Sequence, residues 1–75
     1  MRRYYFDLVI GGHVGEDDEG VILLDLDAAQ KEALRTLADA AKEFITVPAD
    51  MFVQVRDEDG VVMRVKASFE IVRTN

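Results

Sequence analysis

One stretch of the chain, DLDAAQKEALRTLADAAKEFI at residues 25–45, constrains the fold more than any other. Its apolar residues recur at intervals of three and four, which is the period of an amphipathic α-helix. We therefore expect a helix that buries one face. That face is formed by Leu26, Ala29, Ala33, Leu37, Ala40 and Phe44, with Leu34, Ala41 and Ile45 widening it. Its alanines allow a close approach to whatever the helix packs on.

Both ends of this helix carry boundary residues. Asp25 is the expected N-cap, because its short carboxylate can accept a hydrogen bond from a first-turn amide. Asp27 is the rival cap, since Asp27 and Gln30 have the spacing of a capping box. The helix should end before Pro48, because a proline pushes the residue before it, Val47, into extended backbone.

The rest of the chain alternates between apolar and polar residues, as half-buried strands do. We expect four strands, at residues 3–10, 21–24, 51–56 and 61–73. A glycine-rich loop and an acidic turn, EDDEG, connect the first two strands. The last two form a hairpin around DEDG at residues 57–60, where Asp-Gly favours a tight turn.

The order of these elements predicts the fold class. We expect a single α+β domain over residues 1–75, with the order β-β-α-β-β. The strands should form a four-stranded antiparallel sheet with one helix packed on one face. The long last strand, placed in the centre beside the first, gives the strand order 2-1-4-3.

A single helix covers only one side of such a sheet, so the other side meets water or a partner. By alternation, that side carries an apolar set among polar neighbours, namely Tyr5, Val9, Phe52, Val62 and Val72. Contiguous exposed apolar residues usually mark an interaction site. We predict that this set is an interface, with a two-fold homodimer formed through this face or the adjoining sheet edge.

Composition excludes several classes of function. The 75 residues include no cysteine, which rules out disulfides, thiolate metal sites and cysteine nucleophiles. The formal net charge of −6 disfavours nucleic-acid binding, which needs a basic patch. No apolar run approaches the roughly 18 residues of a membrane span. We therefore expect a cytoplasmic protein that binds neither nucleic acid nor membrane.

The acidic turns are the only candidates for chemistry, and they match no known site. A calcium loop needs a glutamate at its twelfth position, whereas counting from Asp57 reaches Ser68 and counting from Asp17 reaches Ala28. A weak calcium contact remains open. His13 and Ser68 are the only histidine and serine, and no phosphate-binding loop is present. We predict no enzymatic activity, no catalytic residue, no cofactor and no bound metal.

Four segments together carry a resemblance to a known family. They are RYYFDL at residues 3–8, DDEG at 17–20, LDLDAAQKEAL at 24–34 and VRDEDGVV at 55–62. The chain resembles a family of short uncharacterised proteins, common in rhizobia and related alphaproteobacteria, that is known as a domain of unknown function. The family more often has proline where Leu24 stands. The resemblance covers nearly the whole chain and implies no catalytic residue.

A second resemblance is to antitoxins of the HicB type, which also place a hairpin before a helix and are acidic modules that cover a basic toxin. The strand order after the helix differs, so this is an analogy. We predict a small non-enzymatic protein-interaction module that self-associates. The alternative is an antitoxin-like or regulatory partner of a basic protein.

Overall fold

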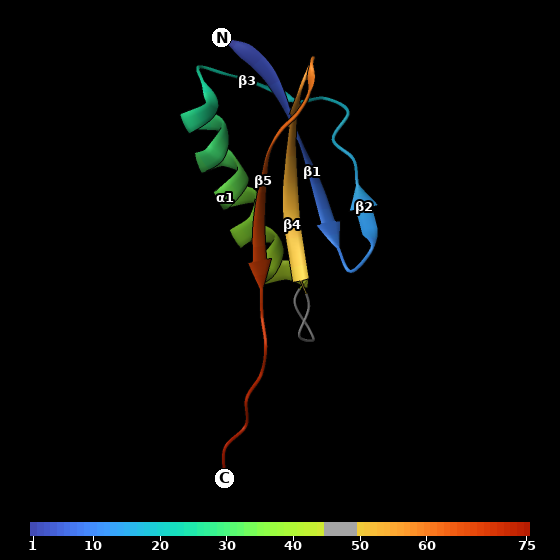
Figure 1. Cartoon of the computed structure of the whole chain (residues 1–75), viewed down its shortest axis with the longest axis vertical. Coiled ribbons are helices and arrows are strands. Elements are labelled where there is room, and N and C mark those ends of the chain that lie inside the picture. The colour runs from blue at the N-terminus through green and yellow to red at the C-terminus, as the bar shows by residue number, and fades with distance from the viewer. Residues whose placement is uncertain (45–49) are drawn as a thin grey trace.

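The computed structural model describes residues 1–44 and 50–75. Its elements, in chain order, are β1 (Arg2–Ile10), β2 (His13–Gly15), β3 (Val21–Leu23), α1 (Leu26–Phe44), β4 (Asp50–Asp57) and β5 (Gly60–Ser68). The strands pair antiparallel in one sheet, and α1 lies against one side of it (Figure 1). The α+β class, with one helix on an antiparallel sheet, is confirmed.

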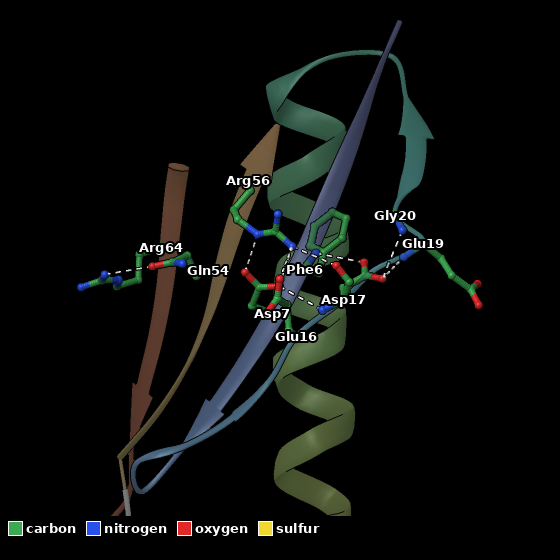
Figure 2. Close-up of polar contacts among 9 residues, drawn as sticks. All are labelled: Phe6, Asp7, Glu16, Asp17, Glu19, Gly20, Gln54, Arg56 and Arg64. Atoms are coloured by element: carbon green, nitrogen blue, oxygen red, sulfur yellow. Dashed lines mark hydrogen bonds and ion pairs between the residues drawn. The ribbon is translucent and has the colours of Figure 1, made fainter. Parts of the chain in front are cut away.

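The expected second strand is one of two short pieces that pair with β1. β2 pairs with the end of β1, with Leu8 opposite Gly15, and β3 pairs with its beginning, with Tyr4 opposite Val21. Residues 16–20 therefore lie opposite only residues 5–7 of β1. The chain bulges away from β1 between the two pieces, on the side of β1 opposite β4 (Figure 2).

Within the described residues the sheet therefore has five strands, one more than predicted. Residues 11–15, interpreted from the sequence as a loop, reverse the chain at once and pair back as β2. Gly11 and Gly12 have φ values of 55° and 94°. A two-residue hairpin loop of type I′ has positive φ at both central positions, and Gly-Gly supplies them without steric cost.

The predicted strand order is wrong. The sheet runs β2-β1-β4-β5, so residues 50–57 are central and the last strand is at the edge. Met51, Val53 and Val55 of β4 are fully buried, as the short apolar alternation of a central strand requires. The length of the last strand was the reason for placing it in the centre, and it was a poor guide. β1 pairs with β4 instead, from Tyr5 opposite Arg56 to Ile10 opposite Met51.

The last strand is also shorter than predicted. β5 ends at Ser68 rather than Arg73, because Ser68 pairs with Asp50, where β4 begins. Residues 69–75 leave the sheet and run away from it (Figure 1). Val72 therefore lies outside the sheet face on which it was predicted.

The N-terminus of α1 begins as expected. Asp25 is the N-cap, since the Ala28 amide donates to Asp25 Oδ1 at 2.9 Å. The rival cap is wrong, because Asp27 lies within the first helical turn, where its charge still favours the helix dipole. Ile45, Val47 and Pro48, on which the predicted C-terminal boundary depends, lie outside the described residues.

The buried face of α1 is an alanine stripe. Ala29 and Ala33 are fully buried, Leu37 and Ala40 nearly so, and Ala41 is half-buried, as predicted. Leu26 and Leu34 contradict the prediction, since each is 49% exposed. The first turn of α1 stands away from the strands (Figure 1), and Leu34 is at the margin of the apolar arc. The side chain of Phe44 lies outside the described residues.

The core lies between α1 and the central strands. Its sheet side consists of Tyr4, Met51, Val53 and Val55. α1 packs mainly on β4 and β5 and only lightly on β1. Leu8 and Ile10 of β1, which face the same side, are consequently only half-buried.

Candidate interaction face of the sheet

The face of the sheet opposite α1, here called the open face, carries the polar side of three strands. Its members are Tyr5, Asp7 and Val9 of β1, Phe52, Gln54 and Arg56 of β4, and Arg64 and Lys66 of β5. The register aligns them in rows, with Val9 beside Phe52 and Lys66, and Asp7 beside Gln54 and Arg64. The alternation predicted from the sequence is therefore correct for β1 and β4.

An ion pair lies at the centre of this face. Arg56 Nε donates to Asp7 Oδ2 at 2.7 Å, and Arg56 Nη2 donates to Asp7 Oδ1 at 3.1 Å (Figure 2). Asp7 is only 4% exposed although it points away from the core. The hydrogen bond from Arg56 outweighs burial and holds the pKa of Asp7 below its usual value. This two-point contact fixes β1 against β4.

The acidic turn completes the network by filling the gap in the strand beside β1. The Phe6 amide, which has no strand opposite it here, donates to Asp17 Oδ2 at 3.1 Å. The Asp17 amide donates to Asp7 Oδ1 at 3.0 Å, and Arg56 Nη2 donates to the Asp17 carbonyl at 2.9 Å. One side chain thus replaces a missing strand partner, which keeps a buried backbone donor satisfied.

Asp17 also shapes its own turn. Its Oδ1 accepts from the amides of Glu19 and Gly20, each at 3.1 Å. Burial acts to raise the pKa of Asp17, but the amides of Gly20, Phe6 and Glu19 outweigh it and leave that pKa below its usual value. The carboxylate is therefore held ionised as an acceptor, which is a structural role rather than that of a general acid.

Gly20 is required where this turn returns to β1. Its φ is 71°, and a Cβ built there would lie 2.9 Å from the Tyr4 carbonyl oxygen. No L side chain fits this position without displacing the backbone of β1. The DDEG segment thus covers the unpaired edge of β1. Asp17 accepts the free amide of that edge, and Gly20 is the residue that lies close against its backbone.

A second carboxylate closes the hairpin between β4 and β5. Arg2 Nη1 donates to Asp57 Oδ2 at 2.7 Å, and the Asp59 amide donates to Asp57 Oδ1 at 2.8 Å. The Asp59 amide is the main cause of the lowered pKa of Asp57, with Arg2 adding to it against the effect of burial. The DEDG turn is confirmed, and both carboxylate oxygens of Asp57 are in use.

Two arginines of the open face lie over its two aromatic rings. The Arg56 guanidinium carbon is 4.8 Å from the centre of the Tyr5 ring, and that of Arg64 is 4.7 Å from the centre of the Phe52 ring. Arg64 is also held by Gln54 Oε1, 3.1 Å from its Nη2 (Figure 2). Each aromatic is therefore partly covered by a cation instead of lying bare.

The structure brings together only part of the predicted interface. Tyr5, Val9 and Phe52 share the open face and are half-buried, and Val62 lies beside them on β5, 38% exposed. Val72 is on the segment after β5 and is 74% exposed. Val9 and Phe52 lie opposite each other, but the row of Asp7, Gln54 and Arg64 lies between them and Tyr5, so this surface is mixed rather than apolar.

Sequence reasoning missed the polar network that underlies this face. The sequence-based prediction treated Asp7 and Arg56 only as polar neighbours of the apolar set, and it interpreted Asp17 only as part of an acidic turn. One pattern pointed to them, since an aspartate in a strand and an arginine in another strand share the polar side of their alternations. That pattern gains meaning only once the two strands are known to be neighbours.

The described residues contain neither a metal-binding cluster nor a helix that could span a membrane. No group of three or more histidines, cysteines or carboxylates is close enough to hold a metal ion within residues 1–44 and 50–75. In the same part of the chain, no helix is both long and apolar enough to cross a membrane.

Comparison with known proteins yields one match. A family model described as "Domain of unknown function (DUF6894)" matches residues 3–68. No curated protein and no solved structure matches the chain. The match confirms that the chain resembles a domain of unknown function. It ends at Ser68, where β5 also ends.

Proposed function

The chain belongs to the DUF6894 family, and since that membership assigns no activity, we propose from the site that it is a small non-enzymatic protein-interaction module. The open face is its contact surface. The observation that carries the proposal is the pair of arginine–aromatic stacks, Arg56 over Tyr5 and Arg64 over Phe52, on a face that α1 leaves uncovered.

These residue types and their order favour recognition of a protein surface. Arginine and aromatic side chains dominate the energetic centres of protein interfaces. Here they are already held in place, Arg56 by Asp7 and Arg64 by Gln54. Side chains ordered before binding lose less conformational entropy when a partner arrives. Arg64 and the exposed Lys66 favour a partner that presents acidic groups to β5.

The same contacts argue against catalysis on this face. The carboxylate of Asp7 and that of the adjoining Asp17 have lowered pKa values because arginine or backbone donors hold them ionised. A general acid needs the opposite shift, towards neutral pH. The open face thus supports binding better than it supports proton transfer.

A different observation favours the alternative function, a regulatory or antitoxin-like partner of a basic protein. The acidic turn exposes Glu16, Asp18 and Glu19, and the hairpin turn exposes Glu58 and Asp59. Exposed acidic groups attract a basic partner and accelerate its association. In this case the turns, rather than the arginine–aromatic stacks, would make the contact.

Affinity capture with charge-reversal variants tests the proposal. The chain carrying Arg64→Glu and Lys66→Glu should lose the protein that the wild-type chain retains from its native extract. The matched control is Lys31→Glu with Lys42→Glu, which reverses two exposed charges on α1. Retention by the control and loss by the open-face variant would support the proposal.

Two results of the same experiment would contradict it. A prey protein that both variants retain would exclude the open face. A basic prey that is lost only when Asp18 and Glu19 are changed to Asn and Gln would favour the alternative. The sequence-based prediction of a homodimer through the open face remains a prediction, and Phe52→Asp tests it.

A further inference from the structure

The segment that follows β5, residues 69–75, is apolar on one side but leaves the sheet. Met63, Val65 and Ala67 of β5 pack against the core, and the alternation continues in the sequence through Phe69 and Ile71. These two are 41% and 69% exposed. The core-facing stripe of β5 therefore extends past the last paired residue without a surface beneath it.

An apolar hollow of about 270 Å³ lies at the opposite edge of the sheet, lined by Leu8, Ile10, His13, Val14 and Gly15. Leu8 and Ile10 face the same side of the sheet as α1, which packs on β4 and β5 instead and leaves them half-buried. Gly15, opposite Leu8, contributes no side chain to fill the space. The hollow is thus a part of the core side that the helix does not reach.

The hollow and the projecting segment lie at the same end of the sheet. Ile10 pairs with His13 on one side and Met51 on the other, and Met51 pairs with Ala67. Three strand spacings of roughly 4.8 Å separate β5 from β2 in this row, or about 14 Å, and seven extended residues reach about 23 Å. The segment runs away from the hollow of its own chain (Figure 1).

A second copy of the chain, related to the first by a two-fold axis normal to the sheet at this end, accounts for both the projecting segment and the unfilled hollow. That rotation keeps the α1 side on the same side and places the β2 edge of the second copy in line with residues 69–75 of the first. We propose that two chains exchange these segments, so that Phe69 and Ile71 of each chain fill the hollow beside Leu8 and Ile10 of the other.

Charge supports this arrangement. In the rotated copy, β2 runs in the same direction as the incoming segment. Arg73, which follows Ile71, then lies towards the acidic residues that follow Gly15, namely Glu16 and Asp18. Apolar residues thus meet apolar residues, and a cation meets anions, in a single alignment. The exchange is reciprocal and closed, as a two-fold interface requires.

This dimer goes beyond the proposed function and uses a different surface. The axis normal to the sheet leaves both open faces uncovered and on the same side of the assembly. Two adjacent copies of the contact surface bind a repeated or dimeric partner with higher avidity than one copy.

Light scattering on a sizing column, at micromolar to millimolar chain concentration, tests the exchange. The wild type should have twice the mass of one 8.4 kDa chain, and Ile71→Asp should reduce it to one chain. Val72→Asp, the same change on the other side of the segment, should remain dimeric. Gly15→Ile should also give monomers by filling the hollow.

Reciprocity gives the sharpest check. The Ile71→Asp chain keeps an intact hollow and the Gly15→Ile chain keeps an intact segment, so their mixture should form a weaker 1:1 dimer with one exchange. Because the chain has no cysteine, Gly15→Cys with Ile71→Cys should oxidise to a covalent dimer. Circular dichroism shows whether each variant is folded.

Several outcomes would overturn the exchange. They are a monomeric wild type, a folded Ile71→Asp or Gly15→Ile variant that stays dimeric, a disulfide within one chain, and a ladder of larger species. Phe52→Asp and the open-face charge variant should both leave the dimer intact. Loss of the dimer in Phe52→Asp would instead place the contact on the open face, as the sequence predicted.

Discussion

The carboxylate of Asp7 and the guanidinium of Arg56, 49 positions apart in the sequence, form a two-point ion pair across the central strands. Arg56 also donates to the carbonyl of Asp17, whose side chain accepts the Phe6 amide. One arginine therefore connects β4, β1 and the acidic turn. The contact positions Arg56 over Tyr5 and closes the interrupted edge of β1.

Removing one partner of this pair should destabilise the fold. Asp7→Asn removes the nearer of the two anions that pair with Arg56, Glu16 being the other, and should lower the free energy of unfolding by about 1.5–3 kcal/mol, as for hydrogen bonds to charged groups. Urea denaturation measures the change. Asp18→Asn, the same substitution at an exposed position, should have little effect.

A double-mutant cycle separates the pair from its surroundings. Asp7→Asn and Arg56→Gln together should cost clearly less than the sum of the two single changes, because the residues are in direct contact. Additive costs would mean that the pair contributes nothing beyond the separate environments of the two side chains.

Stability should fall in acid through the same carboxylates. In the folded chain the pKa values of Asp7, Asp17 and Asp57 are lowered, so below about pH 4 the unfolded chain binds more protons than the folded one. Their stabilisation is complete above the unfolded pKa and is lost as pH falls through the folded values. Urea midpoints from pH 7 to pH 2 should show this decline, and Asp7→Asn should make it shallower.

The sequence predicted elements better than it predicted neighbours. The alanine stripe at Ala29, Ala33 and Ala40 and the Asp25 cap depend on local periodicity and on backbone groups one turn away, and both are confirmed. Strand order depends on contacts between distant segments, such as the contact of Asp7 with Arg56. Alternation within a strand shows which side a residue faces but not which strand lies beside it. For the same reason, the polar network beneath the candidate interaction face was not predicted.

The acidic turn should tolerate no side chain at Gly20. Gly20→Ala combines a positive φ with a clash against the Tyr4 carbonyl and should cost more than the roughly 1–3 kcal/mol of backbone strain alone. Gly12→Ala is the matched control, since Gly12 also has a positive φ but no atom within 4 Å of a built Cβ. Equal losses in thermal denaturation would mean that the turn relaxes away from β1.

The packing of α1 predicts a clear difference between two leucines. Leu37 is 5% exposed and Leu34 is 49% exposed. Leu37→Ala should lower the free energy of unfolding by about 2–5 kcal/mol, the range for truncating a buried leucine. Leu34→Ala should cost much less. An unchanged thermal midpoint for Leu37→Ala would mean that α1 packs on the sheet through a different face.

The hairpin turn should not bind calcium, although its sequence is acidic. Calcium takes six to eight oxygen ligands, and both oxygens of Asp57 are already engaged, one by Arg2 and one by the Asp59 amide. An ion would have to displace Arg2 and would gain only Glu58 and Asp59, which are exposed. Millimolar calcium should therefore leave the thermal midpoint unchanged relative to magnesium, since a ligand at 100 times its Kd adds about 2.7 kcal/mol. A calcium-specific rise that disappears in Asp57→Asn with Asp59→Asn would show that the turn opens to bind the ion.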